Sequence, residues 1–106
     1  MSKVLSKVTE YVKNCLFTGT PTTEFHHLLF GSDRKKADED GLVIPVTREK
    51  HTAATKPEDR IHGNPVAEDL SKMLGQAIWE RNYCAEGHTV AEARAAFMKR
   101  YGKAYY

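Results

Sequence analysis

Four of the five histidines follow an order along the chain that strongly limits what it can fold into. His26 and His27 are adjacent within an apolar run, and His51 and His62 come after a second apolar run at residues 42–46. Neighbours on a strand point to opposite faces, so we expect His26 and His27 to have different partners. We interpret the pattern as two strands followed by a helix that together hold a metal ion.

The length of 106 residues predicts one domain spanning residues 1–106. A chain of this size buries roughly two thirds of its unfolded surface, which allows only a thin core. Two strands would therefore need support from helices, a metal or a partner. The 16 Lys and Arg against 14 Asp and Glu leave a net charge of +2, which gives no strong attraction to nucleic acid.

Cysteine content and hydropathy predict a cytoplasmic protein. The two cysteines do not form a disulfide framework. The sequence has no apolar stretch of membrane-spanning length and no signal peptide pattern, so we expect no membrane partner. No feature of the sequence indicates a small-molecule substrate.

Periodicity and turn residues predict the elements before residue 61. They are a short helix at 2–14, a strand at 24–30, a charged loop at 31–41, a second strand at 42–47 and a loop at 48–60 with one helical turn near His51. Pro45 cannot donate to a strand ladder, so the second strand is expected at an edge.

Capping residues predict two further helices. Asn64 followed by Pro65 opens the longest one. Its expected buried stripe consists of Val66, Leu70, Met73, Leu74, Ala77 and Ile78. Thr89 with Glu92 forms a capping box for a last helix that ends at Gly102. Its expected buried side consists of Val90, Ala93, Phe97 and Tyr101. The predicted class is α+β, with an N-terminal, a long central and a C-terminal helix around a small hairpin.

A metal site on His26, His51 and His62 follows if the strands pair and the long helix packs beneath them. Three neutral imidazoles with an open position suit zinc, and they suit magnesium less well. Manganese and magnesium remain alternatives. An imidazole titrates near neutral pH, so His27 is a candidate general base. The alternative is that these histidines are unrelated surface or packing residues.

Several pieces of the sequence, in this order, carry a resemblance to a known family. They are His26-His27 through Gly31, Arg34-Lys35-Lys36, Gly41-Leu42-Val43, His51, His62-Gly63-Asn64, and the ending Phe97, Tyr101-Gly102-Lys103 and Tyr105. Together they resemble phage HNH endonucleases of the recombination-enhancement (Ref-like) group. The resemblance spans residues 15–106 and implies a treble-clef-like ββα-metal core, phage origin and a place in the host cytoplasm.

The resemblance also implies roles for individual residues. His27 would activate water, and His26 would replace the metal-binding aspartate that usually precedes it. His51 and His62 would complete the metal site. The run Arg34-Lys35-Lys36 would hold the phosphate backbone of DNA. The alternative for this basic run is a solvated loop balanced by the acidic residues 38–40.

The sequence departs from the family at a supporting zinc knuckle. Cys15 is retained, but Thr18 stands at the second cysteine position, and the usual Cys-Pro-Glu-His-His run reads Thr47-Arg48-Glu49-Lys50-His51. Three of the four supporting ligands are thus replaced. We expect that this zinc is lost and that the histidine site is kept, where it helps to hold the fold.

Three functional hypotheses follow. The first is a metal-dependent DNA endonuclease. The second is a non-catalytic zinc protein on the same scaffold that binds and inhibits a host nuclease, as an anti-CRISPR protein does. A third is a DNA-binding accessory protein without activity. The sequence alone leaves open which one holds.

Overall fold

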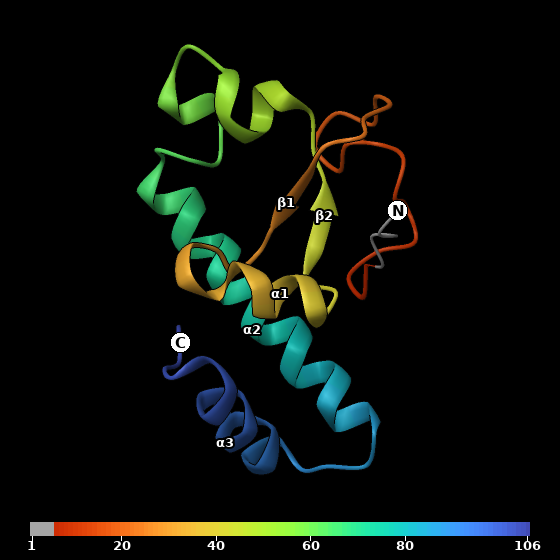
Figure 1. Ribbon diagram of the computed structural model, residues 1–106, viewed down its shortest axis with the longest axis vertical. Helices are drawn as coiled ribbons and strands as arrows, with labels where there is room; N and C mark the ends of the chain where they lie inside the picture. The colour runs from red at the N-terminus through yellow and green to blue at the C-terminus, as the bar shows by residue number, and fades with distance from the viewer. Residues whose placement is uncertain (1–5) are drawn as a thin grey trace.

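A short hairpin and three helices make up most of the fold in the computed structural model, which describes residues 6–106 (Figure 1). The elements are β1 (Phe25–His27), the 3-10 turn η1 (Gly31–Asp33), α1 (Arg34–Glu39), β2 (Val43–Pro45), the π-helical turn η2 (Glu49–Ala53), the 3-10 turn η3 (Pro57–Asp59), α2 (Pro65–Ala85) and α3 (Val90–Tyr101). This arrangement confirms the α+β class. Within residues 6–106, no helix combines the length and the apolar character that crossing a membrane requires.

The hairpin pairs β1 with β2 in antiparallel register, and His26 stands opposite Ile44. Both strands are shorter than predicted, although single backbone bonds extend the pairing at each end. Leu28 N–H donates to Leu42 O at one end, and Val46 N–H donates to Glu24 O at the other. The sheet has two strands, so the expectation of an edge position for the second strand is confirmed.

The core lies where the hairpin meets α1 and the two long helices. Its buried members are Cys15, Leu28, Leu29, Ala37, Leu42, Ile44, Val46, Ile61, Phe97 and Tyr101. Val8, Ile78, Trp79 and Tyr105 pack against this cluster and are only partly buried. The core is thin, as the chain length predicts.

The predicted charged loop at residues 31–41 is mostly helical, so that prediction is wrong. η1 and α1 fill most of it, and Ala37 is its fully buried residue. The backbone closes behind α1, because Leu42 N–H donates to Ala37 O. One buried alanine gives no apolar periodicity, which is why the sequence pattern did not reveal this helix.

The predicted N-terminal helix is absent from residues 6–14, and residues 2–5 lie outside the described part of the chain. This segment pairs with the hairpin instead. The Ser6 hydroxyl donates to Val43 O at 2.7 Å, and Lys7 N–H donates to Gly41 O at 2.7 Å. The open edge of β2 thus offers acceptors that compete with helix formation.

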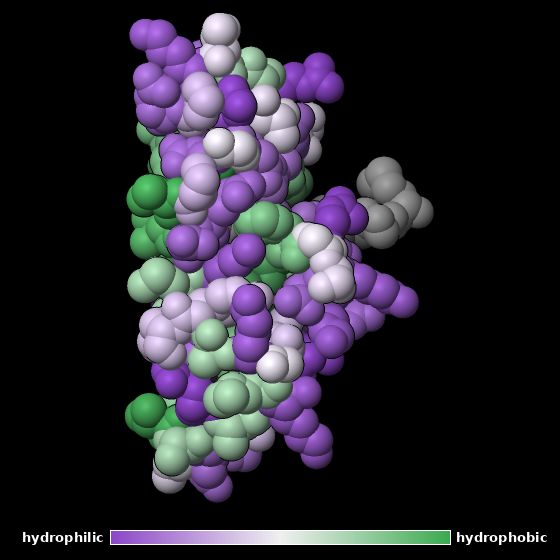
Figure 2. All heavy atoms as spheres, turned by 90° about the vertical axis from the view of Figure 1, so that its left-hand side faces the viewer, coloured by the Kyte–Doolittle hydropathy of each residue, from purple (hydrophilic) through white to green (hydrophobic). Residues whose placement is uncertain are grey.

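Helix α2 begins as predicted but buries a different face. The Asn64 side chain accepts from Ala67 N–H at 3.2 Å, which confirms the cap. The buried residues are Ser71, Gly75, Gln76 and Glu80. The predicted stripe is largely exposed: Val66, Leu70, Met73, Leu74 and Ala77 face solvent, and Ile78 is half-buried. Hydrophobic side chains accordingly gather in patches on the surface shown in Figure 2.

Gly75 lies where α2 comes closest to the end of β1. A Cβ at this position would lie 3.1 Å from Leu28 Cβ and 3.2 Å from Leu29 Cγ. The helix therefore approaches the end of β1 more closely than a larger side chain permits. Close approach accounts for Gly75 on this face, whereas Gln76 accepts from Tyr105 N–H and Glu80 accepts from Arg94 Nε.

Helix α3 follows its prediction closely. Thr89 and Glu92 form the capping box, and Gly102 ends the helix in the left-handed conformation at φ 85°. Ala93, Phe97 and Tyr101 are buried, but Val90 is exposed, so that part of the prediction is wrong.

One carboxylate joins the three helices. Asp40, just after α1, accepts from Trp79 Nε1 at 2.9 Å, Arg100 Nε at 2.6 Å and the Tyr101 hydroxyl at 2.6 Å, all through Oδ2. Trp79 belongs to α2, and the other two donors belong to α3. The acidic run that includes Asp40 therefore has an internal structural role.

A candidate three-histidine metal centre

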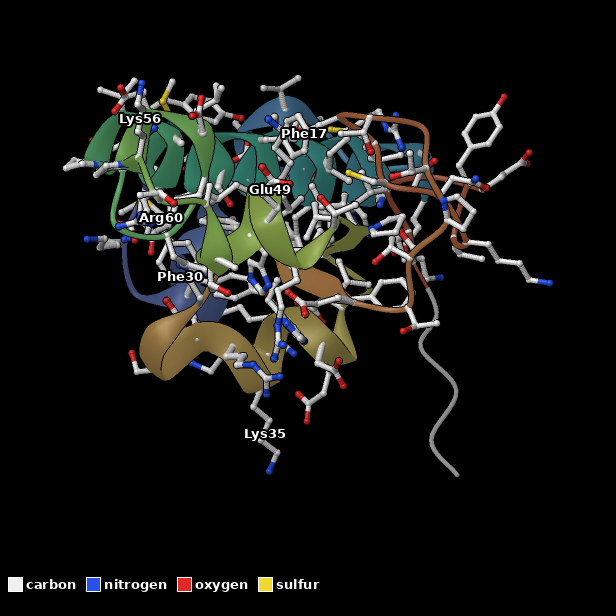
Figure 3. The ribbon with its side chains drawn as sticks, turned by 90° about the horizontal axis from the view of Figure 1, so that it is seen from above. Phe17, Phe30, Lys35, Glu49, Lys56 and Arg60 are labelled. Atoms are coloured by element: carbon white, nitrogen blue, oxygen red, sulfur yellow. The ribbon has the colours of Figure 1, made fainter. Side chains whose placement is uncertain are left out.

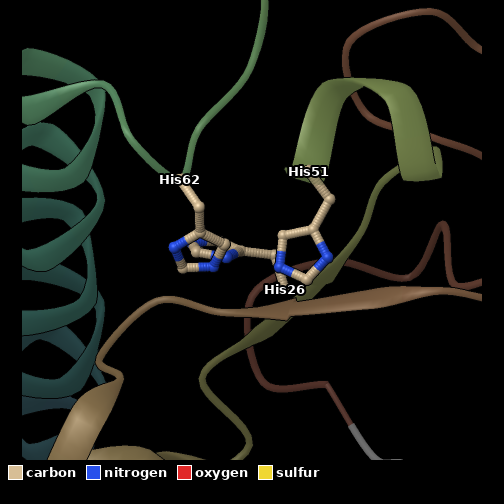
Figure 4. A group of neighbouring side chains, drawn as sticks. All are labelled: His26, His51 and His62. Atoms are coloured by element: carbon tan, nitrogen blue, oxygen red, sulfur yellow. The ribbon is translucent and has the colours of Figure 1, made fainter. Parts of the chain in front are cut away.

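His26, His51 and His62 meet although they come from three separate segments (Figure 4). His26 lies on β1, His51 lies in η2, and His62 precedes α2. One ring nitrogen from each lies within 4.8 Å of the others, and the ring centroids are 4.7 to 5.2 Å apart. The three rings that the sequence predicted to converge do so in the fold.

Backbone pairing between two loop segments positions two of these rings. Ile61 N–H donates to Lys50 O at 2.8 Å, and His62 N–H donates to His51 O at 3.1 Å. The Arg60 guanidinium fastens the same loop, because it donates to His62 O at 2.8 Å and to Ala54 O at 2.7 Å. Arg60 and Glu49 flank this region in Figure 3. The irregular stretch after β2 is thus well fixed.

The hydrogen bonds of Ser71 determine which nitrogen of His26 carries the proton. The Ser71 hydroxyl donates its only hydrogen to Leu28 O at 2.8 Å, because a carbonyl can only accept. Ser71 Oγ must then accept from His26 Nε2, which lies 2.7 Å away. In the neutral ring this leaves a lone pair on His26 Nδ1. That atom is buried and has no hydrogen-bond partner among the described residues.

The other two histidines each hold a carboxylate at Nδ1. His51 Nδ1 lies 2.7 Å from Glu24 Oε2, and His62 Nδ1 lies 3.5 Å from Glu68 Oε2. An ionised carboxylate only accepts, so His51 Nδ1 bears a proton, and the contact with Glu68 favours the same tautomer for His62. In a neutral ring, the lone pair is then on Nε2. Figure 4 shows the three rings turned toward one another.

Burial keeps two of these rings neutral. Burial is the main cause, with the neighbouring imidazoles second, that lowers the pKa of His26 to about 3. The pKa of His62 is lowered by burial and by His51, against the opposing influence of Glu68. Histidines bind a metal in the neutral form, so both rings are ready ligands at neutral pH.

The residues present fit a transition-metal ion. Three imidazole lone pairs that converge in a partly buried site attract a cation, and an all-nitrogen set suits zinc. The contacts of the three rings with Ser71, Glu24 and Glu68 match a known pattern. In it, a metal-binding histidine donates its second N–H to a carboxylate or another acceptor. The unpartnered His26 Nδ1 is the strongest single sign, because buried polar atoms without a partner are rare.

Phe30 forms one wall of the centre. Its ring contacts His62 edge-on at 4.8 Å and His26 at 5.7 Å between centroids. Lys72 Nζ lies 4.8 Å from the centroid of the same ring. Sequence patterns do not single out Phe30, nor the residues Glu24, Glu68 and Ser71 that contact the histidine rings. The two glutamates had one local signal, because each lies within six residues of a candidate ligand.

His27 is separate from this group and has another partner, as the alternation along a strand predicts. Its Nε2 lies 3.0 Å from Asp38 Oδ1 on α1, and only 10% of its side chain is exposed. A histidine held by a carboxylate is the arrangement found in general-base dyads. The nitrogen available for proton transfer is then Nδ1.

The basic run is not a uniform cluster. Arg34 and Lys35 are exposed on α1, and Lys35 points away from the body of the molecule in Figure 3. Lys36 turns inward, where its Nζ donates to Arg100 O at 2.9 Å. Two of the three predicted phosphate-binding side chains therefore remain accessible.

Cys15 and Thr47, at two of the expected knuckle positions, contact each other. The Cys15 thiol donates to Thr47 Oγ1 at 3.9 Å, and the same oxygen accepts from Lys50 N–H. Burial raises the pKa of Cys15, but hydrogen bonds from the Thr18 side chain and from nearby backbone groups outweigh it and lower this pKa to about 7. Hydrogen bonds thus link residues at positions where the resemblance implies zinc ligands.

Comparisons of the chain with known protein families, with curated proteins and with solved structures find no match. The HNH resemblance therefore remains a prediction from the sequence, and the geometry of the histidines carries the functional argument.

Proposed function

We propose that this protein is a metal-dependent DNA endonuclease of the HNH type, with a zinc ion on His26, His51 and His62. The observation that supports it most is the convergence of three imidazole nitrogens within 4.8 Å, one of them buried without a partner. The exposed Arg34 and Lys35 would contact the phosphate backbone.

In this proposal His27 acts on water and Asp38 orients it. A bound ion would supply charge stabilisation at the scissile phosphate. This role of His27 follows from the HNH resemblance, and it requires the phosphate to be reached from both faces of β1, because His27 and His26 point to opposite faces. His27 would then accept a proton from the attacking water at Nδ1, while Asp38, 3.0 Å from Nε2, would stabilise the imidazolium that forms. Water oxygen would form the new bond to phosphorus as the bond to the departing sugar oxygen breaks.

Metal analysis combined with plasmid nicking tests the proposal. We expect close to one zinc ion per purified chain, and nicking of supercoiled plasmid with zinc or manganese. His62→Ala should lose both the ion and the activity, because it removes a ligand. His27→Ala should keep the ion and lose nicking.

His88→Ala is the matched control, because His88 is exposed and outside the histidine group. It should behave like the wild type. Wild-type protein that holds no metal after gentle purification would refute the proposal, and so would nicking that survives in His27→Ala.

The exposed face of α2 favours a second candidate, a zinc-stabilised inhibitor of a host nuclease. Val66 is 79% exposed and Leu70 is 64% exposed, on the same side of the helix as Met73 and Leu74. Rows of exposed apolar residues are typical of protein-binding surfaces. The acidic run is weak support for a basic partner, because Asp38 and Asp40 have contacts within the chain.

Inhibition assays separate the two candidates. An inhibitor would bind zinc, leave plasmid intact and block cleavage by a purified CRISPR nuclease. Leu70→Asp should then relieve the block, whereas Glu58→Lys, a change of the exposed η3 turn, should not. Nicking by the protein alone would contradict this candidate.

A further inference from the structure

We propose that Ser71 and Glu24 are positioning residues for the metal, each of which fixes the protonated nitrogen of one histidine. The inference rests on the metal site of the proposed function and deepens it. It also specifies the ligating atoms: Nδ1 of His26 and Nε2 of His51 and His62.

Ser71 is held firmly enough for this role. It is 7% exposed on the face of α2 that meets the hairpin, and its hydroxyl bonds both Leu28 O at 2.8 Å and His26 Nε2 at 2.7 Å. This relay leaves Ser71 Oγ with no second hydrogen to donate. His26 must therefore place its proton on Nε2 and present Nδ1 to the other rings.

Glu24 fixes the protonated nitrogen of His51 in the same way. Its backbone oxygen accepts from Val46 N–H at 3.0 Å, so the hairpin fixes its position. One carboxylate oxygen lies 2.7 Å from His51 Nδ1, and the other lies 3.9 Å from Arg48 Nε. The strand that carries His26 thus also orients His51.

These contacts matter because a wrong tautomer would place an N–H where a lone pair is needed. A carboxylate partner also makes the opposite ring nitrogen a stronger donor to the ion. Loss of such an outer partner typically weakens metal binding by about 10- to 100-fold. Glu68, at 3.5 Å from His62 Nδ1, is expected to have a smaller effect.

Zinc affinity measured by competition with a chromophoric chelator tests the inference. Glu24→Gln and Ser71→Ala should each weaken zinc binding by about 10- to 100-fold. Glu49→Gln and Ser32→Ala, which change exposed residues of the same types, should bind zinc as the wild type does. Ser71→Thr keeps the hydroxyl and should restore most of the affinity.

A second readout separates positioning from mere structural support. Long-range proton–nitrogen correlation spectra of the zinc-loaded protein report which ring nitrogen is protonated and which one is bound to the ion. The wild type should show His26 protonated at Nε2 and His51 at Nδ1, and Ser71→Ala should change the pattern for His26 alone.

Wild-type affinity in both Glu24→Gln and Ser71→Ala would overturn the positioning role and leave the metal site standing. A His26 ring protonated at Nδ1 in the wild type would overturn it as well. Failure of the wild type to bind zinc at all would instead overturn the proposed function, and this inference with it.

Discussion

At the scale of single residues, the surroundings of His26 limit what its ring can do. It is fully buried, its Nε2 proton goes to Ser71, and its Nδ1 has no partner among the described residues. A buried polar atom left in this state costs free energy unless something binds it. This arrangement supports the proposed role of His26 as a metal ligand.

The same burial predicts acid sensitivity for the folded chain, with or without an ion at the site. The pKa of His26 is about 3 in the folded chain and about 6.5 in an unfolded chain. Between these values only the unfolded chain binds the extra proton. The free energy of unfolding should therefore fall as the pH falls, by about 1.4 kcal/mol per pH unit from His26 alone.

Urea unfolding at pH 7.5, 6.5 and 5.5 measures this slope. Above pH 6.5 the contribution of His26 is fully present. His88→Gln should leave the slope unchanged, because His88 is exposed. Equal stability at pH 7.5 and 5.5 would show that His26 is not held neutral.

Residue order, more than residue type, made the site predictable. An apolar run with a histidine, a second apolar run and two later histidines before a capped helix can fold back in few ways. The residues that hydrogen-bond to the histidine rings could not be predicted from the sequence in this way. Glu24 and Ser71 are ordinary polar residues until the hairpin and α2 bring them to a ring nitrogen.

At the scale of elements, the caps were predictable and the buried faces were less so. Asn64 and Thr89 act within one helical turn, so local sequence determines them. The buried face of α2 depends on how closely Leu28 and Leu29 approach Gly75, which periodicity does not describe. Residues 6–14 show the same limit, because the open edge of β2 overrides their helical spacing.

Gly75→Val should destabilise the protein strongly, because its Cβ alone would lie 3.1 Å from Leu28 Cβ. Overpacking of this kind costs about 1–3 kcal/mol or more. Ala77→Val introduces the same side chain on the exposed face of the same helix and should cost less than about 1 kcal/mol. The two variants are compared by chemical denaturation of the zinc-loaded proteins. Similar losses in both would mean that α2 does not pack closely against the hairpin.

At the scale of the whole molecule, the core is small for the length of chain it supports. The molecule measures 41 × 29 × 22 Å, and its sheet consists of two strands of three residues each. An isolated two-stranded hairpin is marginally stable at best. Helices α2 and α3 pack on each other. The part of the molecule that contains β1, β2 and the loop at residues 46–64, called the hairpin end below, therefore depends most on a further stabilising interaction such as a bound metal.

Chelation of the metal should therefore lower the melting temperature sharply and abolish cooperative unfolding of the hairpin end. Structural zinc sites contribute on the order of 10 kcal/mol, which is comparable to the whole stability of a small domain. Differential scanning calorimetry before and after chelator treatment measures the change, and zinc added back should reverse it. His62→Ala should be insensitive to the chelator. A melting temperature that stays constant after verified metal removal would contradict a stabilising role.

The backbone clamp that joins Lys50 and His51 to Ile61 and His62 has a consequence beyond the site itself. An ion bound to His26, His51 and His62 would link this paired segment to β1. It would thereby close chain loops that the metal-free chain must close through weak contacts alone. In a cell short of zinc, newly synthesised chains would then stay unfolded longer and be degraded sooner by proteases. The supply of a trace nutrient would thus set how much of the protein accumulates.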